Sequence, residues 1–157
     1  MNFDKMASDR KKRYGVGLVG IAFTFIGLYF STMLGMSLQF DKNPQVWFSP
    51  QYYSQFIPFY IAVTLLLSGI FLTAQLAQAN FHLAFFGLTA SEEIVFSWVG
   101  LTSTDLPLSA VIVFFPLSLL ALWLGYLNVL NQKKLSALEA IIGIVASTAF
   151  ILMPRYL

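Results

Sequence analysis

The chain contains no cysteine, one histidine and few charged residues. Without cysteine there are no disulfides, thiolate metal sites, iron–sulfur clusters or cysteine nucleophile. The single histidine, His82, excludes a two-histidine haem site within this chain alone. Charged residues make up 10% of the 157 positions, whereas soluble domains carry roughly 25%. A soluble fold could not cover its surface with so few charges, but a surface that faces lipid needs none.

Several catalytic and cofactor patterns are also missing. There is no Gly-x-Ser-x-Gly elbow and no His-Glu-x-x-His pair. The glycines belong to apolar helical segments, so they form no phosphate-binding loop after a strand. No internal repeat is visible, and an inverted-repeat transporter gains no support. We therefore predict no catalytic residue and no cofactor in this chain, and expect bound lipid.

What the chain does have is a basic run directly before an apolar segment. Arg10, Lys11, Lys12 and Arg13 are consecutive, and no charged residue occurs from Gly15 to Leu38. This order is typical of a transmembrane helix whose N-terminus is cytoplasmic. The apolar stretch exceeds the roughly 7–15 residues of a signal-peptide core, so we expect a retained helix. Residues 1–14 are then a cytoplasmic basic N-terminus, which we interpret as a topology signal and not as a nucleic-acid site.

Four apolar segments are long enough to cross a bilayer. They cover about residues 15–38, 56–79, 106–130 and 136–153. At about 1.5 Å per residue each spans a hydrocarbon core of about 30 Å, the last one barely. We predict an all-α integral membrane protein with a single membrane domain over residues 1–157, built as a bundle of four transmembrane helices.

Residues 81–104 are apolar but ambiguous. Glu92 and Glu93 lie in the middle of the segment, and each acid costs about 2.5–3.5 kcal/mol at the centre of a membrane helix. We therefore predict an interfacial or re-entrant segment. Thr89 and Glu92 have the spacing of a capping box, which predicts a short helix beginning near Ser91.

The distribution of Lys and Arg supports a fifth span as the alternative. With five spans, seven of the nine basic residues lie on the cytoplasmic side and two outside; with four, six lie inside and three outside. The five-span arrangement therefore fits the positive-inside rule better. Both arrangements place the N-terminus in the cytoplasm.

The loop over residues 39–55 is rich in aromatic side chains, among them Trp47, Phe48, Tyr52 and Tyr53. Amphipathic aromatic residues favour the headgroup layer. We interpret the loop as an interfacial belt, with a quinone-like or lipid-headgroup site beneath the rings as the alternative.

Small residues form a face on the first apolar segment. They follow helical spacing: Gly17, Gly20, Thr24, Gly27, Ser31 and Gly35. In lipid such a face lets another helix approach closely. Shorter faces of the same kind recur later: Ser118, Ala121, Gly125 and Asn128, then Ala140, Gly143 and Ser147. Packing within the chain is the simplest explanation of these faces. Because four helices cannot easily hide three such faces and also keep so much aromatic surface, we expect other integral membrane subunits as partners.

Ionisable residues give only weak site candidates. His82, Glu92 and Glu93 are possible metal ligands, but His82 and Glu93 lie roughly 16 Å apart on a straight helix. They could share an ion only if the segment bends at Gly87. Asp41 and His82 could form a site only if their loops meet. Glu92 and Glu93 are candidates for proton or ion handling, or for contact with a partner, unless they lie hydrated among headgroups.

Three functions follow from these observations. The first is a non-catalytic accessory subunit of a multi-subunit membrane complex, such as a membrane oxidoreductase or energy-transducing assembly. The second is a small homo-oligomeric transporter or channel that uses the polar residues between 75 and 93: Gln75, Gln78, Asn80, His82, Glu92 and Glu93. The third is a metal-binding membrane enzyme.

Overall fold

The protein is all-α, with five long helices and one short one. A computed structural model describes residues 3–47, 49–102, 106–130 and 132–156, and the side chains between Tyr14 and Met153 among them. The basic side chains of residues 10–13, and Phe48, fall outside this description. The helices are α1 (Phe3–Met36), α2 (Pro50–Ser54), α3 (Phe56–Thr73), α4 (Ala79–Trp98), α5 (Leu108–Tyr126) and α6 (Ala137–Tyr156).

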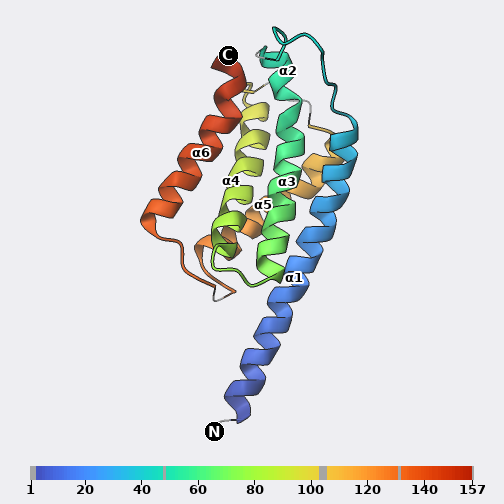
Figure 1. Ribbon diagram of the computed structural model, residues 1–157. Helices are drawn as coiled ribbons and strands as arrows, with labels where there is room; N and C mark the ends of the chain where they lie inside the picture. The colour runs from blue at the N-terminus through green and yellow to red at the C-terminus, as the bar shows by residue number, and fades with distance from the viewer. Residues whose placement is uncertain (1–2, 48, 103–105, 131, 157) are drawn as a thin grey trace.

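The five long helices alternate in direction. Figure 1 shows α4 between α3 and α6, with α1 on the far side of α3 and α5 crossing behind. α1 extends well beyond the bundle at its N-terminal end, and the last turn of α6 lies at the opposite end (Figure 1). The N-terminus and the end of α6 therefore lie at opposite ends of the bundle.

Three helices are long and apolar enough to cross a membrane, and a fourth is shorter. The three are Tyr14–Met36, Pro50–Thr73 and Leu108–Tyr126, and the shorter apolar helix is Ala137–Met153. These spans suggest an integral membrane protein.

For residues 81–104, the prediction of a short helix that begins near Ser91 was wrong. α4 is one unbroken helix of 20 residues from Ala79 to Trp98, so no short helix begins near Ser91 and no bend occurs at Gly87. Half of its positions are buried, because α3, α5 and α6 all pack against it. Its polar residues Asn80, Thr89 and Glu93 are buried against other helices, which the summed hydropathy of the segment cannot reveal. Residues 103 and 104 lie outside the described part of the chain.

A cluster of phenylalanine rings forms the centre of the bundle. Phe23 of α1 and Phe114 of α5 both meet Phe86 of α4 edge to face, with ring centroids 6.4 and 6.3 Å apart. Phe30 packs on Phe114 at 4.8 Å. All four rings are buried. They join α1, α4 and α5 around one point.

Two helices end earlier than the apolar pattern predicts, because their chains turn into left-handed residues. α3 ends at Thr73 and not at residue 79; Gln75 has φ 53°. α5 ends at Tyr126 and not at residue 130; Asn128 has φ 50°. In each turn two amides bond back to the last helical carbonyls, for example Leu76 N to Phe71 O at 2.9 Å. The turn after α3 is a Schellman arrangement, with Gln75 N bonded to Leu72 O at 3.1 Å as well, and the turn after α5 shares its outer bond, from Val129 N to Leu124 O at 3.3 Å. Such turns usually use glycine, so they are not evident from these sequences.

Candidate functional site

The small-residue face of α1 packs against α3 of the same chain. A methyl group at Gly20 would lie 2.6 Å from the backbone nitrogen of Thr73, and one at Gly35 would lie 3.1 Å from the Phe59 ring. A side chain at Gly27 would clash with the backbone of Leu66. Thr24 in turn packs on Gly69, where a side chain has no room. Ser31 has the helical spacing of the same face. A methyl group at Gly17 would meet nothing within 4 Å.

The two later small faces both lie against α4. On α5, Ser118 and Ala121 are fully buried, and a methyl group at Gly125 would lie 2.9 Å from the backbone oxygen of Asn80. On α6, Ser147 is fully buried and Gly143 is buried beside Leu88 of α4. The chain therefore covers most of these small residues itself, with one helix more than the four that we predicted. α4 is the additional helix that covers two of the three faces.

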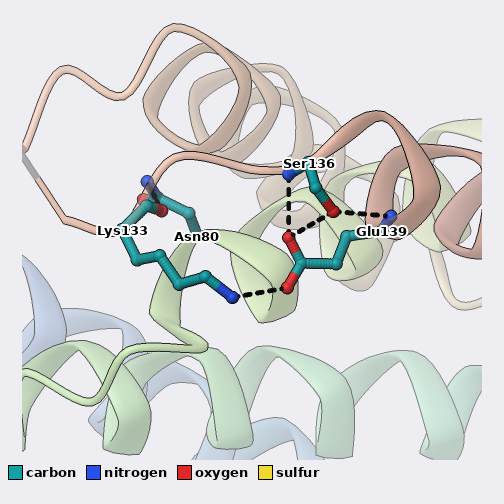
Figure 2. Close-up of polar contacts among 4 residues, drawn as sticks. All are labelled: Asn80, Lys133, Ser136 and Glu139. Carbon is teal, nitrogen blue, oxygen red and sulfur yellow. Dashed lines mark hydrogen bonds and ion pairs between the residues drawn. The ribbon is translucent and has the colours of Figure 1, made fainter.

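At the N-terminal end of α4, Asn80 joins three segments of the chain. Its side-chain amide is 1% exposed and donates to Asn128 Oδ1 at 2.7 Å and to the Lys133 backbone oxygen at 2.9 Å. Figure 2 shows this amide beside the segment that leads into α6. Asn80 thus fastens the α5–α6 connection to α4.

The same connection contains a capping box that was not predicted from the sequence. Ser136 Oγ accepts from Glu139 N at 3.2 Å, and Glu139 Oε2 accepts from Ser136 N at 2.8 Å. Lys133 forms an ion pair with Glu139 at 2.9 Å (Figure 2). The predicted box was at Thr89 and Glu92, but Thr89 lies mid-helix and donates to Phe85 O at 2.6 Å.

Polar side chains also form hydrogen bonds where α3 packs against α4. Ser68 of α3 donates to Thr64 O at 2.7 Å and to His82 O at 2.8 Å, so it bridges the two helices. The His82 ring lies against Phe71, with centroids 3.9 Å apart. Gln75 and Gln78 are exposed in the α3–α4 connection. At this end of α4, side chains donate hydrogen bonds to backbone carbonyls of neighbouring segments: Ser68 to His82 O, and Asn80 to Lys133 O.

Glu92 and Glu93 lie near the other end of α4 and point to different neighbours. Glu93 is fully buried, and its Oε1 accepts from Thr102 Oγ1 at 3.2 Å. Glu92 Oε1 accepts from Thr148 Oγ1 of α6 at 3.1 Å. Glu92 Oε2 is buried and accepts from no residue that the structure describes. The two acids therefore do not form a shared acid–base pair.

The structure does not bring the weak metal candidates together. His82 lies ten and eleven residues from Glu92 and Glu93 on one straight helix, so about 15–16 Å along its axis. Asp41 lies in the connection from α1 to α2, at the end of the bundle opposite to His82 (Figure 1). Among the described residues no three His, Asp or Glu side chains gather as a metal-binding group.

Comparisons with known proteins identify no relative: no family model, curated protein or solved structure matches this chain. Its function must therefore be inferred from its residues and their contacts.

Proposed function

We propose that the chain is a non-catalytic subunit of a larger integral membrane assembly. Its interior polar groups hold its own helices together, as Asn80, Ser68 and Glu92 show. Its outer surface carries many exposed apolar side chains on α1 from Tyr14 onward, on α5 and on α6. Such a molecule presents broad surfaces to neighbours and uses its polar residues as internal fastenings.

The observation that carries the proposal is Tyr29. Its side chain is 64% exposed on α1, and its hydroxyl bonds to no residue that the structure describes. Tyr29 lies seven residues before Met36, so about 10 Å along the axis from the end of the apolar helix. Lipid tails offer a hydroxyl no partner at that depth, whereas another subunit does. Phe25 and Leu28 beside it are exposed as well and extend the contact surface.

Native mass analysis after mild solubilisation tests the proposal. We expect a particle much heavier than the 17.6 kDa chain, with other membrane chains present. Tyr29→Phe should weaken the association roughly 5- to 30-fold, because one interhelical hydrogen bond in a membrane is worth about 1–2 kcal/mol.

Tyr14→Phe is the matched control, since Tyr14 is equally exposed but lies where the apolar part of α1 begins. It should leave the particle unchanged. A stable 17.6 kDa monomer in mild detergent would contradict the proposal.

A second candidate function is proton or ion transfer through α4, which the burial of Glu93 favours. An ionisable side chain enclosed in a membrane bundle is costly and usually functional. Proteoliposomes that contain the protein should then show a flux that Glu93→Gln abolishes and that Glu139→Gln, at the exposed start of α6, preserves. Flux equal to that of empty vesicles would remove this candidate.

A further inference from the structure

A pocket open to the surface lies in the connection between α1 and α3, at one end of the bundle. It has a volume of about 630 Å³, within the usual range for a site that holds a small ligand. Its lining comes entirely from the segment between Gln39 and Gln55. A second cavity of about 200 Å³ adjoins it and shares Gln51 and Gln55.

Side-chain hydrogen bonds hold this connection in shape. Gln55 closes it by accepting from Gln39 N at 2.9 Å and donating to Gln39 O at 3.1 Å. Asp41 Oδ1 accepts from Asn43 N at 2.8 Å, and Trp47 Nε1 donates to Asp41 O at 2.7 Å. These bonds restrict the conformations of the connection, which lowers the entropy cost of binding a ligand there.

The pocket carries one charge of each sign. Asp41 and Lys42 both line it, beside the amide of Gln51 and the Tyr52 ring. The one ion pair among the described residues joins Lys133 to Glu139, so Asp41 and Lys42 do not neutralise each other. A ligand that offers both an anion and a cation would complement them.

The location of the pocket favours a lipid headgroup among the ligands that carry both charges. The pocket lies between the ends of α1 and α3, both of which are long enough to cross a membrane. Trp47 and Phe40 are exposed beside it, as is usual for aromatic residues at the level of lipid headgroups.

We propose that this pocket binds the headgroup of a zwitterionic phospholipid of the phosphatidylethanolamine class. Lys42 binds the phosphate, Asp41 binds the ammonium group, and Gln51 lies within the same lining to donate to phosphate oxygens. In this headgroup two carbons separate the phosphate from the ammonium group. Lys42 and Asp41, which would bind them, are adjacent in the chain and both line the pocket. The inference concerns lipid recognition and does not depend on the proposed subunit function.

Native mass spectrometry of the delipidated full-length chain in detergent tests the site. Dioleoyl phosphatidylethanolamine is titrated against dioleoyl phosphatidylglycerol, which has the same tails but no ammonium group. We expect the ethanolamine lipid to bind about tenfold more tightly, since a charge-assisted hydrogen bond is lost with the glycerol lipid.

Three variants separate the roles. Asp41→Asn keeps an oxygen for the Asn43 amide but removes the charge, so it should abolish the preference for ethanolamine. Lys42→Gln should weaken both lipids about tenfold. Lys134→Gln, on the α5–α6 connection, should change neither.

Equal affinity of the native chain for both lipids would overturn the proposal, as would unchanged binding in Asp41→Asn and Lys42→Gln. Soluble glycerophosphoethanolamine is the last arm of the test. If it displaces the lipid at equal concentration, the site serves a soluble zwitterion and the assignment to a membrane lipid is wrong.

Discussion

Asn80 illustrates how single polar residues stabilise this protein. It is almost completely buried, and one amide nitrogen serves two acceptors, on Asn128 and Lys133. Asn128 holds the left-handed conformation that ends α5, so the bond supports a strained backbone position as well. Nothing in the local sequence identifies this partner, because the two asparagines are 48 residues apart.

We expect Asn80→Ala to lower the free energy of unfolding by about 1–3 kcal/mol, because it removes a buried donor that serves two acceptors on the α5–α6 connection. Thermal unfolding in a mild detergent measures the change. Gln78→Ala is the control, since Gln78 is exposed and makes no side-chain cap bond. Equal stability of the two variants would mean that Asn80 contributes little to the junction.

Two segments show why capping is hard to predict from spacing alone. Thr89–Glu92 and Ser136–Glu139 have the same pattern of a hydroxyl followed three residues later by a glutamate. Only Ser136 lies outside a helix with free amides in front of it, so only there does the box form. Thr89 follows ten helical residues, and its hydroxyl bonds to the preceding turn.

At the scale of the helices, glycine positions determine how closely α1 and α3 approach. Three glycines of α1 each contact a different residue of α3. Gly20 lies near Thr73, Gly27 near Leu66 and Gly35 near Phe59. The descending partner numbers follow from the antiparallel direction of the two helices. Gly17 belongs to the same sequence face but faces open space, because α3 has already ended at Thr73.

Alanine substitutions at two of these glycines should therefore act in opposite directions. Gly27→Ala overpacks the contact with Leu66 and should destabilise the bundle by about 1–3 kcal/mol. Gly17→Ala meets nothing within 4 Å and should stabilise α1 by up to about 1 kcal/mol through helix propensity. Unfolding midpoints in the same detergent compare them, and a Gly27→Ala variant as stable as Gly17→Ala would contradict the close approach.

The helices that can be predicted well from the sequence are those that are apolar along their whole length. Three of the four predicted apolar segments correspond to helices long enough to cross a membrane, because length and hydropathy suffice there. α4 was misjudged because Asn80, Glu92 and Glu93 count as costs against lipid, whereas their actual neighbours are protein groups. Hydropathy reports on transfer into lipid, and it cannot tell which residues a neighbouring helix will cover.

For the molecule as a whole, α4 decides whether the chain crosses a membrane an odd or an even number of times. With α4 as a pass, the connection that carries Lys133 and Lys134 lies at the same end of the bundle as the N-terminal extension of α1 (Figure 1). This is the arrangement that gathers seven basic residues on one side. Four passes would instead place these lysines at the level of Lys42, against the positive-inside rule.

The absence of cysteine makes this arrangement directly testable. Single-cysteine variants Lys5→Cys, Lys42→Cys and Lys134→Cys are exposed in cells to a membrane-impermeant maleimide. If α4 crosses the membrane, position 42 reacts from outside, while positions 5 and 134 react only after permeabilisation, because both then lie on the cytoplasmic side. Labelling of position 134 together with 42 would show that α4 does not cross, and its two acids would then need a hydrated environment at the surface.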